Sequence, residues 1–309
     1  MLSLRQIRRR IKSVENTKKM TRAMEMVAAA KLKKLQDLLK QSDRYIGELK
    51  RILGTLMSEK PLAHPLLEKR EEVKSVLAFL IASDTGLCGS YNTNIFEQAN
   101  RFLTLHLPPP SSGRGKEGGQ PVHFVTIGRR AAAFLKRRKQ MISKELNIPR
   151  PQEIEQTVSD VAQIAKDEFQ SGQADRVIFI YTKVFSLGSM KPATEQLFPI
   201  VSEDHSPHLP LPSSGGGKEE GAVDYIIEPS LPEILDAILP EFIEAEVSQF
   251  IKHALVAEQA ARMMAMRQAT DNAEEMIETL TLARNKARQA SITKELIEVV
   301  SGSRALQMK

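Results

Sequence analysis

Apolar residues recur at seven-residue intervals along the first sixty positions. One row holds Ile7, Val14, Thr21, Ala28, Leu35, Ser42, Leu49 and Leu56, and the other holds Ile11, Lys18, Glu25, Leu32, Leu39, Ile46 and Leu53. Two such rows are typical of the a and d positions of a coiled coil. No Gly or Pro interrupts residues 1–46, and the pattern ends before Pro61. Residues 1–60 are therefore predicted to form one helix, roughly 80 Å long at 1.5 Å per residue.

The middle of this helix has weak core positions. Lys18, Thr21, Glu25 and Ala28 stand where a stable helix pair favours Ile or Leu. A polar residue at such a position costs stability and is usually kept for register or for a contact with another partner. The pattern indicates that the middle of the helix faces more than one partner.

A second long helix is predicted at the other end of the chain, over residues 230–309. Neither Gly nor Pro occurs from Glu241 to Ser301. The start is marked by Ser230 as a cap with Pro232 in the first turn, and Gly302 predicts the end. One apolar stripe holds Ile243, Val247, Phe250, Ala254, Ala257, Ala261 and Met264, and a stripe of shifted phase holds Met276, Leu280, Ala283, Ala287, Ala290 and Ile297.

Residues 70–228 predict a separate α/β domain. Short apolar runs at 71–83, 121–128 and 175–184 alternate with helical patterns at 93–107, 129–139 and 153–172, with further edge strands at 190–200 and 224–229. This alternation predicts a Rossmann-like parallel sheet with right-handed crossovers. Two Pro-, Gly- and Ser-rich inserts, at 108–121 and 202–222, have the composition of linkers. Both contain S-S-G-x-G-K-E but lack G-x-x-x-x-G-K-[ST], so neither predicts a phosphate site.

The net charge of +6 is concentrated in one segment. Residues 1–40 hold 12 Lys or Arg and 3 Asp or Glu, a balance of +9, which leaves 6 − 9 = −3 for the rest. An acidic partner is therefore expected. Nucleic acid is disfavoured because the segment has no stacking aromatics, and a membrane surface because the apolar rows already require a coiled-coil partner.

The remaining composition offers little for chemistry. One cysteine excludes an internal disulfide, the six histidines are scattered, and no cofactor or metal is expected. No apolar run is long enough to span a bilayer, and the basic N-terminus lacks the apolar core of a secretory signal. These features favour a reducing, cytosol-facing location.

The stretch "SDTGLCGSYNTN", residues 83–94, contains the single cysteine between two glycines. It lacks the G-x-G-x-x-G of a dinucleotide fold. Three interpretations stay open: a strand-to-helix turn or subunit contact, an anion contact at a helix N-terminus, and a nucleophile at Cys88. Asp84, Thr85 and Ser90 are candidate caps for the following helix.

From residues alone the chain is a long coiled-coil interaction protein with an α/β head, and a free-standing adaptor that binds an acidic protein is the alternative function.

Three stretches resemble a known family. "IKSVENTKKMTRAMEMVAAAKLKK" at 11–34, "SDTGLCGSYNTN", and "EQAARMMAMRQATDNAEEMI" with "LARNKARQASITKELIEVVSGSRAL" at 258–306 are similar to segments of the gamma subunit of the F-type rotary ATP synthase, bacterial type. They occur in the family's order from one end of the chain to the other. The two Ser- and Gly-rich inserts depart from the family pattern.

The resemblance implies a central rotor shaft. The terminal helices would form an antiparallel coiled coil inside a ring of alpha and beta subunits, and the α/β domain would contact the membrane c ring and the epsilon subunit. Catalysis would belong to the beta subunits. The chain would lie peripherally on the cytoplasmic side of the inner membrane and meet the membrane only through the complex.

The resemblance also implies positions for the contacts. On the two helices, the expected beta-subunit contacts are Lys18, Lys19, Arg22, Met24, Arg262, Arg288, Gln289, Thr293 and Glu295. The last turns, from Ile297 to Leu306, would sit in an apolar sleeve of the ring. On the c ring and epsilon side, the expected foot turn is Asp84, Gly86, Leu87, Cys88 and Gly89.

Overall fold

The computed structural model describes residues 3–59, 64–68, 70, 72–106, 121–186, 188–200 and 230–307. The chain divides into two compact units, which we treat separately. The helical unit comprises Met1–Lys31, Leu87–Gly89 and Gln259–Lys309, and the sheet unit comprises Leu32–Gly86 and Ser90–Glu258. Two long helices, α1 (Leu4–Glu59) and α5 (Leu231–Gln307), contribute residues to both units.

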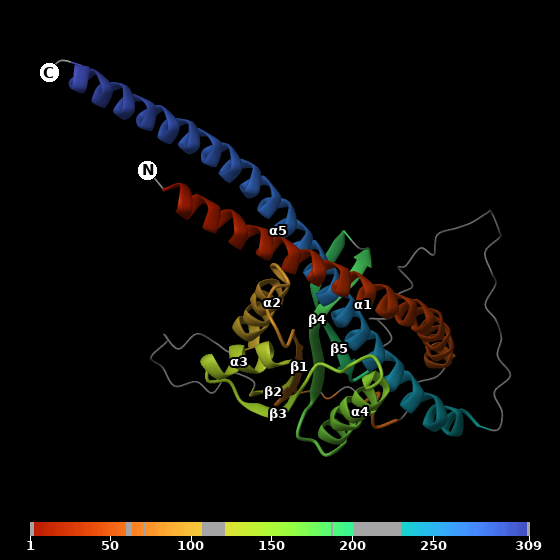
Figure 1. Cartoon of the computed structure of the whole chain (residues 1–309). Coiled ribbons are helices and arrows are strands. Elements are labelled where there is room, and N and C mark those ends of the chain that lie inside the picture. The colour runs from red at the N-terminus through yellow and green to blue at the C-terminus, as the bar shows by residue number, and fades with distance from the viewer. Residues whose placement is uncertain are drawn as a thin grey trace, which may run out of the picture. The chain divides into compact units, whose positions relative to one another are not determined.

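The sheet unit contains five strands in the order β3-β2-β1-β4-β5 (Figure 1). The strands are β1 (Val76–Ile81), β2 (Val122–Ile127), β3 (Ile142–Leu146), β4 (Arg176–Ser186) and β5 (Ser189–Phe198). The first four run parallel, and β5 pairs antiparallel with β4. The connecting helices are α2 (Tyr91–His106), α3 (Arg129–Arg137) and α4 (Ile154–Gln170). The predicted α/β class and parallel sheet are confirmed.

The strand prediction missed one edge strand of the sheet and found the other. Strand β3 was missed because its sequence, ISKEL, lies at the sheet edge and only its end residues are partly buried. The predicted edge strand at 190–200 is confirmed as β5. The predicted strand at 224–229 and the insert at 202–222 lie outside the described residues, as does the insert at 108–121 except for its last residue.

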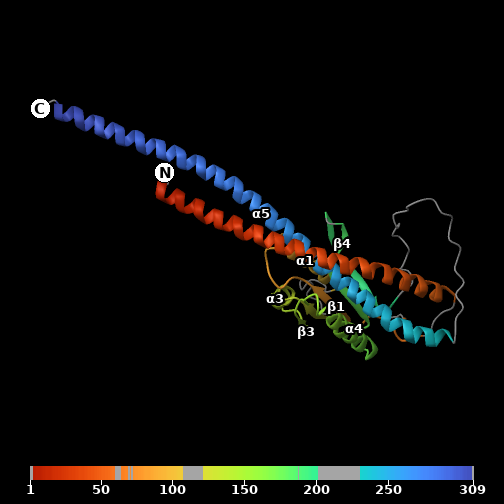
Figure 2. The same ribbon diagram turned by 45° about the vertical axis from the view of Figure 1, so that its right-hand side comes forward.

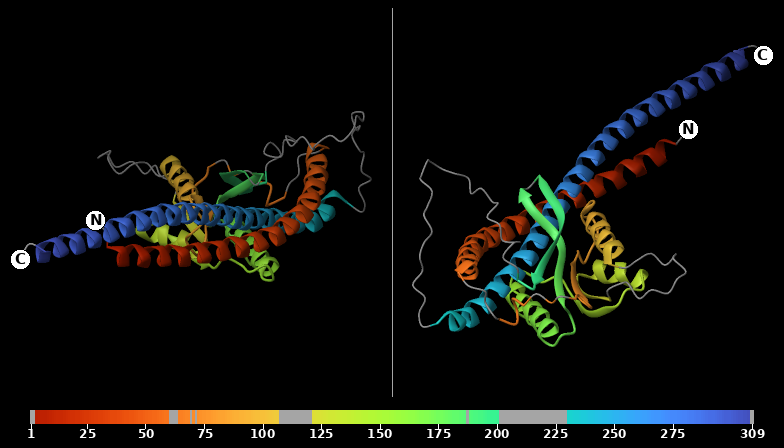
Figure 3. Two further views of the ribbon diagram at one scale, coloured as in Figure 1. Left: turned by 45° about the horizontal axis from the view of Figure 1, so that its top comes forward. Right: turned by 180° about the vertical axis from the view of Figure 1, so that it is seen from behind.

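The core of the sheet unit lies on both faces of β1, whose six residues are all buried. On one face the ring of Phe79 stacks on Phe179 at 4.4 Å, and Phe250 of α5 packs on Phe179 at 4.8 Å. On the other face Leu80 and its neighbours pack with Ile95 of α2 and with α3. The segment of α5 in this unit therefore covers the face opposite α2 and α3, as the rear view in Figure 3 also indicates.

In the helical unit, the two helices run antiparallel and side by side (Figure 2). Lys18 pairs with Glu274 while Thr21, further along α1, pairs with Thr270, earlier on α5. The heptad prediction for α1 is confirmed, because every described member of its two rows is buried or partly buried along the whole helix.

The predicted stripe on α5 is right in the sheet unit and only partly right in the helical unit, where Ala261, Leu280 and Ala287 are partly buried. Ile243, Val247, Phe250, Ala254 and Ala257 are all buried in the sheet unit. In the helical unit, the side of α5 that faces α1 instead carries Met266, Thr270 and Ala273, all buried, whereas Met264, Met276 and Ile297 are 42%, 53% and 60% exposed, and Ala283 and Ala290 are exposed as well. The predicted stripe mixes large and small apolar residues, and its phase differs from that of the buried seam, which includes the hydroxyl-bearing Thr270.

The ends of α5 were predicted with mixed success. Ser230 directly precedes the helix, its hydroxyl donates to Glu233 Oε1 at 2.8 Å, and its carbonyl accepts from Ile234 N at 3.1 Å. The predicted start is confirmed. The predicted end at Gly302 is wrong, because α5 continues through it to Gln307. A single glycine lowers helix stability by only about 1 kcal/mol relative to alanine.

Candidate functional site

The polar middle of the helical unit is a hydrogen-bonded seam. Thr21 and Thr270 are buried, and their hydroxyl oxygens lie 2.8 Å apart. Thr21 Oγ1 also lies 3.1 Å from Lys18 O, and Thr270 Oγ1 lies 2.8 Å from Met266 O. Each hydroxyl has one proton, so one threonine donates to its own helix while the other donates across the seam. Thr21 therefore occupies a core position because its polar partner lies on the other helix.

An ion pair borders this seam at the surface. Lys18 Nζ lies 2.7 Å from Glu274 Oε1, and the hydrogen bond from Lys18 lowers the pKa of the Glu274 carboxyl. Lys18, expected to face beta subunits, thus already has a partner within the chain. Lys19 and Arg22 are exposed, and Met24 is partly buried. The outward basic surface of α1 at this level consists of Lys19 and Arg22.

The C-terminal part of α5 is the most exposed stretch of the helical unit. Arg262 is partly buried, whereas Arg288, Gln289, Thr293 and Glu295 are all exposed. Figure 2 shows that α5 continues beyond the start of α1, so among the described residues of the unit no helix lies beside its last turns. Large apolar side chains are exposed here as well: Ile292, Leu296, Ile297, Val299 and Val300. A contiguous exposed apolar surface of this kind indicates an interaction site.

The glycine turn is divided between the two units. Asp84 and Gly86 belong to the sheet unit, whereas Leu87, Cys88 and Gly89 belong to the helical unit. Gly89, at φ +57°, lies against α5, where an added Cβ would be 3.7 Å from the Cβ of Ala265. Leu87 is also in the left-handed region, at φ 64°, and is 62% exposed. The tip of the turn therefore packs on α5 and presents Leu87 outward.

The capping prediction for this turn is partly wrong. The carboxylate of Asp84 accepts from Arg129 N at 2.9 Å, so it caps α3 and not the following helix. Ser90 precedes α2, and its carbonyl accepts from Asn94 N at 2.9 Å. Asp84 reaches α3 because the ends of neighbouring parallel strands β1 and β2 lie at the same edge of the sheet.

The thiol of Cys88 is buried, with 2% of the residue exposed. A reactive thiol needs an accessible, electropositive environment, whereas buried cysteines are usually structural. This burial favours a packing role over a nucleophile. Within the described ranges, no group of three or more His, Cys, Asp or Glu side chains could hold a metal ion.

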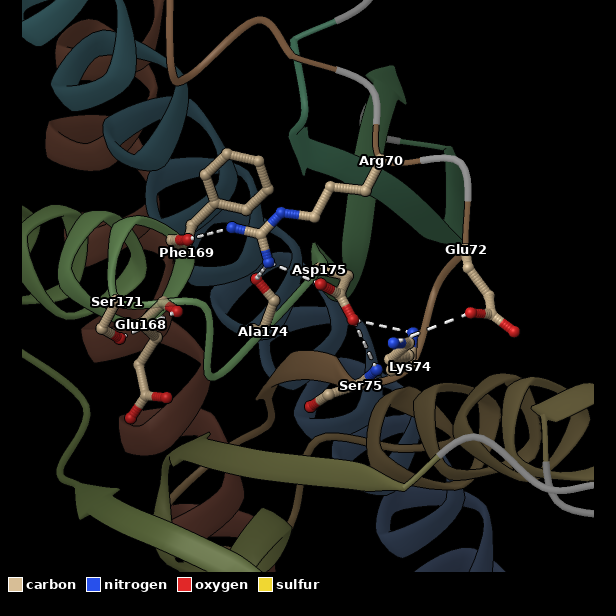
Figure 4. Close-up of polar contacts among 9 residues, drawn as sticks. All are labelled: Arg70, Glu72, Lys74, Ser75, Glu168, Phe169, Ser171, Ala174 and Asp175. Carbon is tan, nitrogen blue, oxygen red and sulfur yellow. Dashed lines mark hydrogen bonds and ion pairs between the residues drawn. The ribbon is translucent and has the colours of Figure 1, made fainter. Parts of the chain in front are cut away.

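Sequence reasoning missed one polar network, in the sheet unit (Figure 4). Asp175 forms an ion pair with Arg70 and accepts from the backbone N–H groups of Lys74 and Ser75 at 2.7 and 2.9 Å. Arg70 also donates to Phe169 O at 2.8 Å. Burial acts to raise the pKa of Asp175, but the hydrogen bonds from Arg70 and the two N–H groups outweigh it and lower the pKa. The network ties the segment before β1 to the α4–β4 connection.

Comparisons with known proteins find relatives along nearly the whole chain. A family model described as "ATP synthase" matches residues 3–306. The chain is 38% identical over 310 aligned positions to the ATP synthase gamma chain of Chlorobium limicola, covering 99% of this chain and 100% of the relative. It is also 38% identical to the ATP synthase gamma chain of Xanthomonas campestris, covering 98% of this chain and 99% of the relative.

Solved structures share the fold. The rotor of Euglena gracilis mitochondrial ATP synthase is similar with a TM-score of 0.61 and 18% identity, covering 94% of this chain and 98% of that one. The central stalk and c ring structure of the Tetrahymena thermophila mitochondrial enzyme matches with a TM-score of 0.54 and 19% identity, covering 81% of this chain and 99% of that one. In the part of this chain that the structure describes, every helix is too short or too polar to cross a membrane.

Proposed function

The chain belongs to the ATP synthase gamma chain family, and from this membership we infer that it is the central rotor shaft of a proton-translocating ATP synthase. The shaft couples rotation of the membrane c ring to ATP synthesis and hydrolysis in the ring of alpha and beta subunits. The observation that carries this inference is the match to gamma chains along nearly the whole length. The antiparallel pair of long helices supports it.

We propose that the helical unit contacts the beta subunits through both helices. The proposed contacts are Lys18, Lys19, Arg22, Met24, Arg262, Arg288, Gln289, Thr293 and Glu295. Most of these side chains are exposed, which suits contacts that are made and broken as the shaft turns. Exposed ion pairs contribute only about 0–1 kcal/mol each. Pairs of this strength hold a rotational position briefly without locking the shaft.

The last turns of α5 would sit in an apolar sleeve of the alpha and beta ring, from Ile297 to Leu306. The exposed Ile297, Val299 and Val300 support this placement, because such side chains are stabilised when a partner covers them. Catalysis would belong to the beta subunits and not to this chain. The chain would be held peripherally at the cytoplasmic side of the bacterial inner membrane by its contacts with the c ring and epsilon.

Reconstitution with alpha and beta subunits tests the shaft role. The isolated chain should show no ATP hydrolysis, and it should stimulate turnover when added to the two partners.

The double variant Arg288→Ala with Gln289→Ala should impair proton-driven ATP synthesis. The matched control, Gln163→Ala with Lys166→Ala on α4, should keep the wild-type rate. A free-standing adaptor would bind its acidic partner without alpha and beta subunits and leave ATP turnover unchanged.

The partner of the glycine turn needs its own test. We expect Leu87 to meet the c ring or the epsilon subunit. The tip of the glycine turn belongs to the helical unit, however, and this unit is proposed to contact the beta subunits, so the beta subunits are the competing partner. Leu87→Cys in a Cys88→Ser background places one reactive thiol at the exposed position. A cross-link to epsilon or the c ring supports the expectation. A cross-link to beta contradicts it and leaves the shaft role intact.

A further inference from the structure

We propose that α3 and the turn after it bind the surface of an anionic phospholipid membrane. Residues 129–144 contain seven Lys or Arg and no Asp or Glu. The inference concerns the sheet unit, so it goes beyond the role of the shaft. It adds a direct lipid contact to those that the chain is proposed to make with the membrane through its partners.

The fold explains why these cations point outward. Ala131, Ala132, Phe134 and Leu135 are buried, and three of them belong to the core cluster beneath the helix. The opposite face of α3 is therefore left to the basic residues, and Arg129, Arg130, Lys136, Arg137, Arg138 and Lys139 are all exposed. Because the apolar face of α3 is already in the core, the helix would meet a membrane through its basic residues, by attraction to anionic headgroups.

Carboxylates within the chain neutralise only part of this face. Lys136 pairs with Glu145 at 2.7 Å, and Arg129 lies 3.9 Å from Asp84. Among the described residues, Arg137 and Lys139 form no ion pair, and the guanidinium of Arg138 lies over the Phe134 ring at 4.6 Å. The C-terminal end of α3 thus carries a local excess of positive charge. We call Arg137, Arg138 and Lys139 the basic corner.

An exposed apolar side chain accompanies the basic corner. Met141 is 63% exposed and leads directly into β3. Leu105, at the end of α2, is 82% exposed. In a parallel βαβ unit the helix runs back toward the amino ends of the strands, so the ends of α2 and α3 approach the same edge of the sheet. Apolar side chains among cations can enter the headgroup region while the cations meet lipid phosphates.

The shape of the surface favours a membrane over an acidic peptide or a nucleic acid. The basic corner lies at the end of a nine-residue helix: Arg137 is its last residue, and Arg138 and Lys139 are in the turn that follows. A cavity of about 230 Å³ in this unit is lined by residues outside the basic corner, including Lys144, Asp167 and Glu168. A peptide carboxylate needs a defined cradle, whereas a membrane presents diffuse charge. The exposed Met141 and Leu105 are not aromatic, so they provide no platform for stacking bases.

Vesicle binding by the full-length chain tests the proposal. The chain should bind phosphatidylcholine vesicles that contain phosphatidylglycerol and should not bind phosphatidylcholine alone. Arg137→Gln with Lys139→Gln should lower the partition coefficient by about 25-fold, since each basic residue near an anionic surface contributes about fivefold. The control Lys33→Gln with Lys34→Gln removes the same charge from exposed positions on α1 and should keep the wild-type value. Equal losses in the two variants, or equal binding to both vesicles, would overturn the proposal.

A second measurement uses the assembled, membrane-embedded complex. Met141→Cys and, separately, Gln156→Cys on α4 are each labelled with a fluorophore in a Cys88→Ser background. Phosphatidylglycerol carrying a headgroup nitroxide should quench the label at 141 more strongly than the label at 156. Equal or weaker quenching of the label at position 141 would refute lipid contact. So would a cross-link to a protein subunit when the unlabelled Met141→Cys variant is treated with a thiol cross-linker. Neither result would affect the shaft role, which the reconstitution measures separately.

Discussion

At the scale of single residues, the close approach of two backbone segments makes Gly128 a necessary glycine. Its φ is +104°, and an added Cβ would lie 2.0 Å from the carbonyl oxygen of Ala82. The contact is backbone to backbone, so no side chain can move aside. Both Gly128 N and the neighbouring Ala82 N donate to strand carbonyls, at 2.8 and 2.9 Å, which holds the segments in place.

Gly128→Ala should therefore destabilise the sheet unit by about 4 kcal/mol or more, in the range reserved for severe steric conflicts. Gly172→Ala is the matched control, because its φ is +77° but nothing lies within 4 Å of the added Cβ. That variant should lower the free energy of unfolding by roughly 1 kcal/mol, which is the strain of an alanine in the left-handed backbone conformation. Urea unfolding of the full chain measures both. Similar costs for the two variants would show that the close approach is not decisive.

The network around Asp175 supports a second prediction at this scale. Asp175→Asn should lower the free energy of unfolding by about 2 kcal/mol, because it removes a charged acceptor that serves Arg70 and two backbone N–H groups. Glu72→Gln is the control: Glu72 lies 3.7 Å from Lys74, but both side chains are largely exposed (Figure 4). This control should change stability by less than about 0.5 kcal/mol. Urea unfolding would contradict the assignment if the two costs were equal.

The same network predicts a dependence on pH. Because the folded state lowers the pKa of Asp175, this carboxylate stabilises the fold fully above its unfolded pKa of about 4. The contribution is lost as pH falls through the lowered folded-state pKa. The stability difference between wild type and Asp175→Asn should therefore shrink in acid. Urea midpoints across the acid range check this, and a constant difference would contradict it.

These residue contacts mark the limit of sequence reasoning. A strand-to-helix turn was one of the three interpretations of residues 83–94, and the structure bears it out. Asp84 was proposed as a cap of the helix that follows. It caps α3, however, and not the helix that follows, because the fold brings positions 84 and 129 together. Arg70 and Asp175 lie 105 residues apart, and no local pattern links them. Such partners depend on the register of the sheet, which a single sequence does not reveal.

At the scale of elements, periodicity predicted long regular segments well and short or exposed ones poorly. The heptads of α1 and the buried strands β1, β2 and β4 have strong apolar patterns, and all were found. Strand β3 was missed because an edge strand has few buried side chains. In the helical unit the seam of α5 includes Thr270, a polar residue that a pattern of apolar positions does not identify.

The seam between α1 and α5 supports a prediction at this scale. Thr21→Val and Thr270→Val should each destabilise the seam by about 1 kcal/mol, since each removes one hydroxyl of a buried pair. The double variant should cost less than the sum of the two single variants, because both single changes remove the same hydrogen bond across the seam. Hydrogen exchange of the α1 amides near Thr21 measures this locally. Thr17→Val is the control, because Thr17 is exposed and bonds only within its own helix. Strictly additive costs would mean that the two hydroxyls do not act as a pair.

At the scale of the whole molecule, the contacts proposed for this chain are distributed over exposed surfaces of both helices and the glycine turn. Periodicity and charge predicted a coiled-coil interaction protein, but they could not name its partners. The resemblance of three stretches supplied the rotor role, and the matches to gamma chains bear out the family. The apolar end of α5 shows why the residues alone could not name the partners. Its exposed apolar side chains indicate that a partner covers them, but they do not say which protein that partner is.

This apolar end supports the last prediction. Leu296 and Val300 are 60% and 53% exposed and lie one helical turn apart. Leu296→Ser with Val300→Ser should reduce self-association of the isolated chain, because less apolar surface faces water. If burial in the alpha and beta ring stabilises the complex by about 1.5 kcal/mol for each of these side chains, the variant should bind the ring about 100-fold more weakly.

Phe185→Ser removes an equally exposed apolar side chain from the β4–β5 hairpin and serves as the control. It should leave the affinity for the ring unchanged. Titration of each chain into alpha and beta subunits, with sedimentation of the free chains, separates the two effects. Equal weakening by both variants would indicate a general loss of solubility or fold. Undiminished affinity in the α5 variant would place the end of the shaft outside the apolar sleeve.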